Sequence, residues 1–520
     1  MSLRLPLAHP KIDSNNLELL YLAAADCFHE RRTCSKTCSP ALGISKPSEP
    51  PFLPRRVIDI GDGEEAANSR VRLHESVLDE RAQYTTLSHR WGDQIAERTM
   101  RKNITSRCTG IDTNILPKSF RDAITVTRKL GVRYLWIDAI CIIQDDHADW
   151  IEQAPQMGKI YQHAYCTIAA HSAENSMTGF LESKPSDYIL RIGCYKAKTG
   201  VSGTLHIGAP RSFDQAVDQS YLKRRAWALQ ELTMSRRTVH CSNGRMYWSC
   251  RHIAQPRPLG FKSELSANPS PTWRIFDRDV STDESWFDLV TDYSKCELTY
   301  PSDKLAAISG IAMELQTRTD EIYRSGLFES SLPQGLLWFS GGQSLKRQDQ
   351  RVPSWSWGSV DGPIQFMKTQ HTSAEAEIVA LGRNKPANGV VSATSFDNIL
   401  VIIAAARETW IDATPVEFGI ENSVAGSFLR PGGTTIGGLG LSRAGRGTFD
   451  AGNLKKQKVA LCVRICTKRV RVEHVLLETY LVLLLAPSEH VLGRYRRIGV
   501  GIIYEHGWFD RSSPRRLEVM

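Results

Sequence analysis

The stretch that most constrains the fold is the segment 134–150, which reads YLWIDAICIIQDDHADW. Its first four residues, Tyr134 to Ile137, form a short apolar run rich in strand formers, which is typical of a buried strand. Asp138 ends this run, and further aspartates follow at positions 145, 146 and 149. In open α/β sheets, ligands bind just beyond the carboxyl ends of the strands. Carboxylates directly after a buried strand therefore indicate a ligand-binding edge.

The residues before this strand predict a helix over 120–130. Ser119 is a typical N-cap, and Gly131 is a typical stop after the last turn. The apolar residues Phe120, Ala123, Ile124 and Leu130 fall on one face of such a helix. Helix, glycine, buried strand and acidic loop together predict one unit of an α/β fold.

Similar patterns on both sides of this unit extend the predicted sheet. Strands are expected at 57–60, 71–73, 84–88 and 165–170. Helices are expected at 150–163, with Pro155 in the first turns, and at 225–232. Asn243-Gly244 between two β-rich runs predicts a hairpin over 238–249. The alternation of strands and helices predicts a mostly parallel sheet covered by helices on both faces.

The length of 520 residues is more than one hydrophobic core usually supports, so we expect several domains. The pattern predicts a poorly ordered leader and linker over 1–54, the α/β domain over 55–255, and a helical connecting region over 256–350. A β-rich region follows over 351–520, with strands near 375–381, 398–406, 458–466, 475–486 and 495–504. Its Gly-rich segment 426–447 is expected to be a flexible loop.

Charge and hydropathy indicate a cytoplasmic protein without a nucleic-acid partner. The net charge is +9, and its basic residues are scattered, whereas nucleic-acid binders concentrate basic charge on one face. The longest apolar run, Tyr480 to Ala486, is too short for a membrane span, which needs about 20 residues. The amino terminus lacks a signal-peptide layout, so the 12 cysteines are expected to be reduced thiols.

A metal site is not expected, although four candidate ligands lie close together near the amino terminus. These are Cys27, His29, Cys34 and Cys38. Their spacing matches no standard zinc pattern, and no second pair of ligands follows.

The end of the strand 84–88 is the second candidate for a site. Ser88 runs directly into His89, Arg90, Trp91 and Gly92, which is unlike an ordinary turn. One interpretation makes Trp91 a core residue and Gly92 a position with positive φ. The other puts Ser88, His89 and Arg90 at the rim of a pocket. Asp138 has the same ambiguity, because its carboxylate either accepts backbone amides of the following turn or binds ligand hydroxyls.

Several common catalytic classes are excluded by their missing motifs. The chain has no Gly-x-Ser-x-Gly elbow, no His-Glu-x-x-His pair and no Gly-x-x-x-x-Gly-Lys phosphate loop. Gly438-Leu439-Gly440 has neither a strand before it nor a helix after it, so it is no dinucleotide fingerprint. Cys141 lies near two histidines, but it belongs to an apolar run and is expected to be a buried, unreactive thiol.

Three separated blocks together resemble the fungal heterokaryon incompatibility (HET) domain. They are YTTLSHRWGD over 84–93, LGVRYLWIDAICIIQDD over 130–146, and RAWALQEL over 225–232. Shorter features also fit, among them Gly179-Phe180-Leu181 and the later segment Pro353 to Trp357. The chain departs from the family at His89, where an aromatic residue is more common, and at Pro155. The resemblance implies a role in non-self recognition between fungal cells that ends in growth arrest or cell death.

The order of elements also resembles the Toll/interleukin-1 receptor (TIR) domain, whose sheet is flavodoxin-like. Some members of that class hydrolyse NAD with a glutamate in a Trp-x-x-x-Glu spacing, which Trp227 and Glu231 reproduce. The resemblance implies Glu231 as the catalytic residue and NAD as a substrate, with no bound cofactor. The ligand-binding residues would be Ser88, His89, Arg90, Trp91, Asp138 and Trp227.

Two alternatives remain open at this point. A tryptophan at this spacing is more often a core residue than a pocket residue, and Glu231 is also explained as a helix cap or as the partner of Arg224 or Arg225. In that case the domain is a non-enzymatic signalling adaptor that docks on a second copy or on an incompatibility partner protein. The enzyme hypothesis predicts that Glu231, Trp91 and Ser88 share one open pocket.

Overall fold

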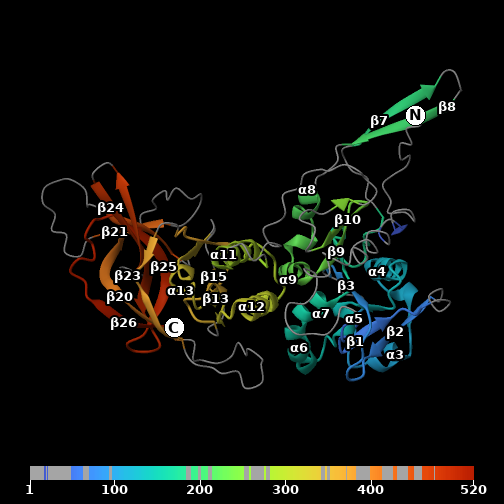
Figure 1. Cartoon of the computed structure of the whole chain (residues 1–520), viewed down its shortest axis with the longest axis horizontal. Coiled ribbons are helices and arrows are strands. Elements are labelled where there is room, and N and C mark those ends of the chain that lie inside the picture. The colour runs from blue at the N-terminus through green and yellow to red at the C-terminus, as the bar shows by residue number, and fades with distance from the viewer. Residues whose placement is uncertain are drawn as a thin grey trace. The chain divides into compact units, whose positions relative to one another are not determined.

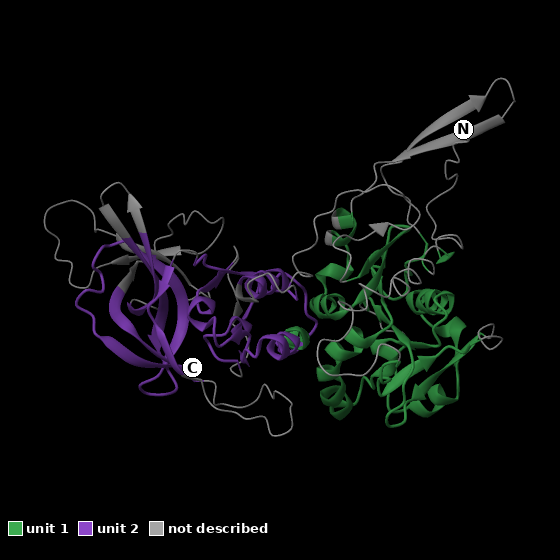
Figure 2. Ribbon diagram, in the orientation of Figure 1, with its two compact units in different colours: residues 1–274, 307–311 green, residues 275–306, 312–520 purple. Residues whose placement is uncertain are grey.

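The computed structural model of the protein is shown in Figure 1. It describes residues 17, 18, 20, 49–62, 69–92, 97–182, 189–196, 201–208, 213–250, 257–258, 275–276, 282–340, 346–347, 352–369, 372–381, 399–412, 425–429, 443–449, 459–472 and 475–520. The chain divides into two compact units, which are coloured separately in Figure 2. The α/β unit comprises residues 1–274 with 307–311, and the β-rich unit comprises residues 275–306 with 312–520.

The α/β unit is built on a nine-stranded sheet whose centre is parallel. The four central strands are β5 (Tyr134–Trp136), β3 (Tyr84–Ser88), β6 (Thr167–Ala170) and β9 (Arg237–Ser242), in that spatial order. Each pair of neighbours among them is parallel. Numbered along the chain, the strands lie in the order 2-1-3-4, which is the flavodoxin-like order.

Antiparallel strands extend this centre at both edges. On one side lie β1 (Arg56–Asp59), β2 (Arg70–Glu75) and β4 (Ile111–Asp112), and on the other β10 (Arg245–Cys250) and β11 (Arg257–Pro258). The predicted hairpin is confirmed: β9 and β10 pair around Asn243 at φ 48° and Gly244 at φ 74°. Positive φ at both positions is the requirement of the type I′ turn.

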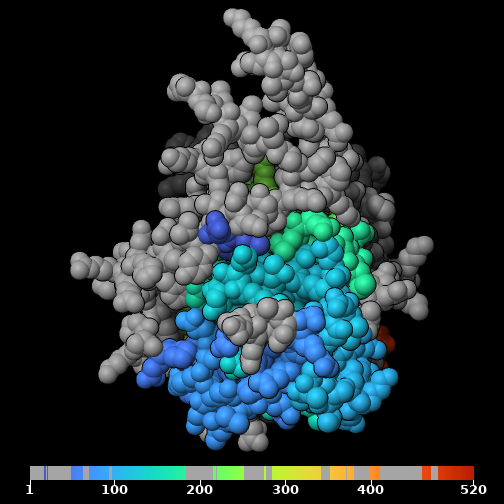
Figure 3. Space-filling model, turned by 90° about the vertical axis from the view of Figure 1, so that its right-hand side faces the viewer, coloured from blue at the N-terminus to red at the C-terminus, as the bar shows by residue number. Residues whose placement is uncertain are grey.

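Helices cover both faces of the parallel strands. They are α3 (Ile104–Thr109), α4 (Lys118–Lys129), α5 (Asp138–Cys141), α6 (His147–Gln153), α7 (Met157–His163), α8 (Phe213–Asp218) and α9 (Ala226–Met234). Figure 1 shows α4 on one side of the strands and the contacting pair α7 and α9 on the other. The crossover from β3 to β5 and the crossover from β5 to β6 run in opposite directions across the sheet, so right-handed connections place their helices on opposite faces. Figure 3 shows the face made by the amino-terminal half of the unit, blue to green. The predicted α/β fold class is confirmed.

Two of the predicted helices differ in detail from the structure. The N-cap of α4 is Pro117, not Ser119, because the Ser119 amide donates to the Ser176 carbonyl instead (2.9 Å). The single helix expected over 150–163 is two helices, α6 and α7, separated by a 3-10 turn at Ala154–Gln156. Pro155 lies in that turn, where its missing amide interrupts the α-helical hydrogen bonds.

The predicted stop of α4 is confirmed. Gly131 has φ 69°, and its amide donates to the Arg128 carbonyl while the Val132 amide donates to Thr127. This left-handed residue closes the helix just before β5.

The long insertion between β6 and α9 contains a further antiparallel pair, β7 (Ile189–Lys196) and β8 (Val201–Gly208). The leader expected over 1–54 lies outside the described residues except at 17, 18, 20 and 49–54. The same holds for the four Cys and His residues near the amino terminus. Among the described residues, no cluster of His, Cys, Asp and Glu could hold a metal ion.

The β-rich unit begins with helices and small strand pairs. They are α11 (Thr282–Tyr293), α12 (Ala306–Thr319), α13 (Leu332–Gly335), β12 (Tyr323–Arg324), β13 (Leu327–Phe328), β14 (Trp338–Ser340), β15 (Lys346–Arg347), β16 (Val360–Asp361) and β17 (Ile364–Phe366). Of α12, residues 307–311 are counted with the α/β unit. No helix in the described part of the chain is long and apolar enough to cross a bilayer.

The second large sheet follows these helices. Its strands are β18 (Thr372–Ala374), β19 (Glu377–Leu381), β20 (Leu400–Asp412), β21 (Ala425–Leu429), β22 (Arg443–Phe449), β23 (Val459–Val472), β24 (Val475–Pro487), β25 (Tyr495–Ile503) and β26 (Pro514–Val519). Its core includes Cys462, Tyr480 and Trp508. The flexible loop predicted over 426–447 is corrected in part, because β21 and β22 pair with each other within it. Residues 430–442 lie outside the described residues.

Candidate functional site

Three elements of the α/β unit bring polar side chains to the carboxyl edge of the parallel strands. Ser88 is the last residue of β3, Asp138 is the first residue of α5 just after β5, and Glu231 lies in the second turn of α9. In the flavodoxin-like order, this edge holds the switch point beside the first strand, where such folds bind ligands. We call the network formed by Ser88, Trp91, Asp138, Arg225 and Glu231 the carboxylate site.

The Glu231 carboxylate lies at the bottom of this network and has no exposed surface. Ser88 Oγ donates to its Oε2 atom at 2.5 Å, although the two residues are 143 positions apart. Arg225 Nη1 donates to its Oε1 atom at 3.3 Å. Tyr161 on α7 packs over the same group, and its hydroxyl donates to the Leu87 carbonyl at 3.2 Å. Burial raises the pKa of Tyr161 well above its usual value, so this hydroxyl remains a donor.

The second carboxylate, Asp138, is held from three sides. Trp91 Nε1 donates to both of its oxygens, at 3.1 and 2.9 Å. Arg225 Nη2 donates to Oδ2 at 3.0 Å. The Ala139 amide donates to Oδ1 at 2.8 Å, so the carboxylate accepts a backbone amide of the following turn, as the first of its two alternatives predicts. Binding of ligand hydroxyls, the second alternative, stays a prediction.

Arg225 connects the two carboxylates. It is the N-cap residue of α9, and its Nη1 atom also donates to the His89 carbonyl at 2.8 Å. Its guanidinium lies 5.8 Å from the centre of the Trp91 ring. The Arg225 side chain keeps 19% of its surface exposed, against 5% for Asp138 and 0% for Glu231. Arg225 is therefore the partly exposed member of this trio, while both carboxylates are enclosed.

Charge and burial oppose each other at Glu231. Burial raises the pKa of its carboxyl group, the nearby Asp138 charge adds to this rise, and Arg225 and Ser88 reduce it. The net direction is upward. The site thus holds one acid that is more easily protonated than usual beside a permanently charged guanidinium.

His89 is a buried polar side chain beside this network. Its ring is 0% exposed and meets Phe120 of α4 edge-on, with centroids 5.1 Å apart. Nδ1 lies 4.0 Å from Asp138 Oδ1, and neither ring nitrogen has a hydrogen-bond partner. Burial lowers the pKa of His89 to about 4, although Asp138 opposes this shift. The imidazole is therefore neutral at pH 7 in this structure.

The loop that carries Trp91 is held in place by contacts with Asn175 and Ser176. Gly92 has φ 83°, and a Cβ atom at this position would lie 2.4 Å from Asn175 Cβ. The Ser176 amide and hydroxyl both donate to the Trp91 carbonyl. These contacts explain why a glycine follows Trp91, and they confirm the predicted positive φ.

The structure combines some of the predicted site residues and leaves others outside. Ser88, Trp91, Asp138 and Glu231 share one network, and His89 contacts it. Two others, Arg90 and Trp227, are partly exposed nearby. The expectation of an open pocket is wrong for this structure, since Glu231 is fully enclosed. Sequence reasoning treated Arg225 only as a partner of Glu231 and missed its link to Asp138, 87 positions away.

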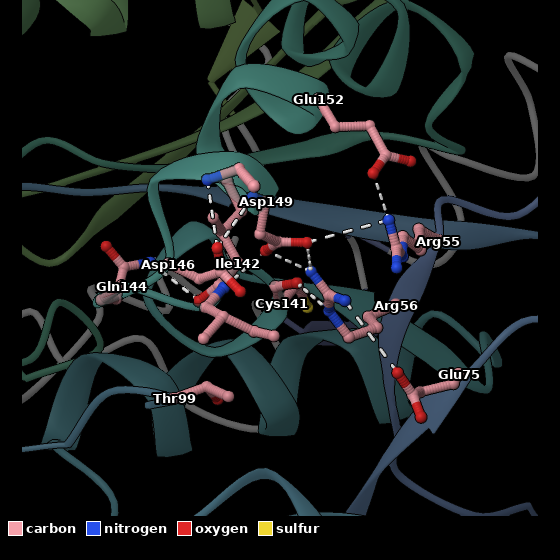
Figure 4. Close-up of polar contacts among 12 residues, drawn as sticks. Arg55, Arg56, Glu75, Thr99, Cys141, Ile142, Gln144, Asp146, Asp149 and Glu152 are labelled. Carbon is pink, nitrogen blue, oxygen red and sulfur yellow. Dashed lines mark hydrogen bonds and ion pairs between the residues drawn. The ribbon is translucent and has the colours of Figure 1, made fainter. Parts of the chain in front are cut away.

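The remaining aspartates of the central stretch have structural roles. Asp149 accepts from Arg56 of β1 with both oxygens, as Figure 4 shows, and it also accepts from the Ile143 amide. Asp146 caps α6 through the Ala148 and Asp149 amides. Asp145 accepts from the Arg101 amide. Only Asp138 of the predicted acidic edge therefore belongs to the site.

Cys141 is confirmed as a buried thiol. Its side chain is 2% exposed, and burial raises its pKa to about 12. A thiol that stays protonated is a poor nucleophile.

Comparison with known proteins identifies part of this unit. Residues 84–231 match the family model described as Heterokaryon incompatibility protein (HET). The match begins at the first residue of β3 and ends at Glu231, so it includes every residue of the carboxylate site. No curated protein and no solved structure matches the chain. The resemblance to TIR domains therefore remains a prediction.

Proposed function

Because residues 84–231 match the heterokaryon incompatibility family model, we propose that this chain acts in fungal non-self recognition by hydrolysing NAD at the carboxylate site. The observation that carries the proposal is the hydrogen bond from Ser88 to Glu231 at the carboxyl edge of the central strand. It joins the end of the first parallel strand to the helix that bears the Trp-x-x-x-Glu spacing.

The reaction breaks the bond between C1′ of the ribose and the nicotinamide nitrogen. The nitrogen keeps the bonding electron pair, so nicotinamide leaves as a neutral molecule. Water adds to C1′ and releases one proton, and the second product is ADP-ribose. Positive charge develops on the ribose in the transition state, as in glycoside cleavage.

The chemistry of the site suits this transition state. A carboxylate fixed by Ser88 is preorganised beside the position where positive charge develops, so it needs no reorientation during the reaction. Asp138 supplies a second negative charge on the opposite side of Arg225. Trp91 offers an aromatic face, which can stack on a flat ring and exclude water. Loss of cellular NAD then accounts for growth arrest or death.

The test is the variant Glu231→Gln in the full chain, because glutamine keeps the shape and still accepts from Ser88. Release of nicotinamide from NAD should fall by about 100-fold or more, the effect of losing one preorganised electrostatic group. Glu152→Gln is the matched control, since Glu152 is an exposed carboxylate on α6. NAD levels in cells expressing each variant should follow the same order.

A second function is favoured by the burial of Glu231 and its bonded partners. A carboxylate that is 0% exposed and held by Ser88 and Arg225 also fits a purely structural role. The domain would then be a signalling adaptor that docks on a second copy or on a partner protein. In that case cells expressing Glu231→Gln keep the growth arrest of the wild type, and NAD levels do not change in either.

A further inference from the structure

We propose that Arg225 determines the substrate specificity of the carboxylate site by opening it only to ligands that carry both a cationic ring and a diphosphate. In the closed state its guanidinium takes the place of the positive charge of the nicotinamide–ribose group. When the ligand enters, its diphosphate becomes the new partner of Arg225. The inference rests on the proposed NAD hydrolysis and adds a selection step to it.

The first support is the charge of the closed site. Asp138 and Glu231 are two buried carboxylates that share a single guanidinium, at 3.0 and 3.3 Å. Removing the cation without replacement leaves buried charge uncompensated, which is strongly unfavourable. Arg225 can therefore leave only if another positive charge arrives. The oxidised nicotinamide ring of NAD brings that charge, and the reaction increases it on the ribose.

The second support is the position of Arg225. Its side chain is the exposed member of the ion-paired trio, and it precedes α9, whose amino end carries positive partial charge. Arg225 makes no side-chain cap to α9, and its guanidinium donates to Asp138, Glu231 and the His89 carbonyl. A planar guanidinium matches phosphate oxygens in a bidentate manner, which makes a diphosphate a suitable second partner.

The third support is His89, which explains how Asp138 stays compensated after Arg225 moves. Its Nδ1 atom is 4.0 Å from Asp138 Oδ1, and both of its nitrogens lack hydrogen-bond partners although the ring is fully buried. Buried polar side chains are normally hydrogen-bonded, so an imidazole without partners indicates a role that the closed state does not show. The charged groups that face it are Asp138 and Arg225. When Arg225 leaves, a small movement brings the imidazole into hydrogen-bond distance of Asp138.

The consequence is a preference that can be measured with two substrates. NAD carries the cationic ring and the diphosphate, whereas nicotinamide riboside carries the same ring and glycosidic bond without any phosphate. The wild type should therefore hydrolyse NAD far better than nicotinamide riboside. In Arg225→Gln the preference should fall by about 10- to 100-fold, the range for losing one charge-assisted hydrogen bond.

The experiment compares full-length wild type, Arg225→Gln and Arg224→Gln with both substrates. Arg224 is the matched control, because it is an exposed arginine one position away. The KM for NAD should rise in Arg225→Gln, and Arg224→Gln should keep the wild-type preference. An unchanged preference in Arg225→Gln, or an equal loss in both variants, overturns the proposal. Absence of NAD hydrolysis in the wild type overturns the proposed function instead.

A binding measurement tests the anion step without catalysis. Inorganic pyrophosphate, titrated calorimetrically into the full chain, should bind the wild type and Arg224→Gln but bind Arg225→Gln at least about tenfold more weakly. If Arg225→Gln does not fold, Arg225→Lys replaces it, since lysine keeps the charge but not the bidentate geometry. Equal pyrophosphate affinity of the wild type and the folded variant refutes the role of Arg225.

Discussion

Among the described residues of the α/β unit, three imidazoles are buried, those of His89, His171 and His240, and burial lowers the pKa of each. The value for His89 falls to about 4 and that for His171 to about 3, and His240 lies well below its usual value. His171 Nε2 and His240 Nδ1 share one hydrogen bond at 2.9 Å, and their outer nitrogens bond Ser220 and Ser249. Protonating either ring of this pair places a positive charge in a fully buried position, which burial disfavours.

These shifts predict that the unit loses stability in mild acid. The folded pKa of His89 lies below the unfolded value of about 6.5, so the unfolded chain binds protons first as the pH falls. The contribution is complete above the unfolded pKa and is lost as the pH falls toward 4. Between about pH 6.5 and pH 5, one such histidine lowers the free energy of unfolding by about 2 kcal/mol.

His89→Phe should remove this share of the pH dependence. Phenylalanine keeps a flat ring against Phe120 and does not titrate. Calorimetric melting of the full chain at several pH values should give a shallower decline for the variant than for the wild type. The His171–His240 pair remains in both proteins and serves as an internal reference. Parallel declines would contradict the assignment of His89.

Substitutions at two glycines can distinguish the cost of backbone strain from the cost of a steric clash. Gly92 and Gly131 have φ 83° and 69°, but only Gly92 faces a neighbour, Asn175, where a Cβ atom would lie. Gly131→Ala should lower the free energy of unfolding by about 1–2 kcal/mol through strain alone. Gly92→Ala should cost at least about 1 kcal/mol more, since Asn175 must also move. The difference in thermal midpoint between the two variants is the measurement, and equal midpoints would be the contrary result.

At the scale of elements, a buried ion pair attaches β1 to the segment that follows β5. Arg56 is 1% exposed, and its guanidinium donates to both oxygens of Asp149 and to the Cys141 carbonyl. Arg55 and Glu152 form an exposed pair beside it, as seen in Figure 4. The ion pair of Arg56 and Asp149, which we call the Arg56 clamp, therefore fixes the loop between α5 and α6. Through this loop it also fixes the start of α5 at Asp138.

The Arg56 clamp predicts that the effects of substituting its two residues on the free energy of unfolding are not additive. Arg56→Met alone should lower the free energy of unfolding by about 3–5 kcal/mol, because it leaves the buried Asp149 charge without its partner. Adding Asp149→Leu should restore much of this loss, since an apolar pair of similar size replaces the charges. Urea unfolding of the wild type, both single variants and the double variant supplies the cycle. Additive losses would mean that the two side chains do not interact.

The same elements indicate which features the sequence determines locally. The strand predicted at 84–88 and the Asn243-Gly244 hairpin agree with the structure, because β-rich composition and turn chemistry are local signals. The predicted cap of α4 at Ser119 is wrong, because the helix begins at Lys118 and the Ser119 amide donates to Ser176 of a distant loop. The closed state of the site also depends on a contact between distant parts of the chain, because Ser88 and Glu231 meet only after the sheet has formed.

At the scale of the whole molecule, the segment that matches the family model is shorter than the sheet to which its strands belong. β5 pairs with β1 on one side of the matched segment, and β6 pairs with β9 on the other. Both partners lie outside residues 84–231. A fragment cut at these limits would therefore expose both edges of its three central strands to water and to other chains.

This predicts that residues 84–231 alone do not fold, whereas residues 49–274 do. The shorter fragment loses β1 with the Arg56 clamp and the buried Val57, and it loses β9 and β10 with the buried side chains of Val239 and Cys241. Near-ultraviolet circular dichroism and a cooperative thermal transition should appear only in the longer fragment. If the shorter fragment showed the near-ultraviolet signal and the cooperative transition, the strands at the sheet edges would not be needed for folding. The carboxylate site would then depend only on the strands that carry it, and Asp138 would keep its position without the clamp from β1.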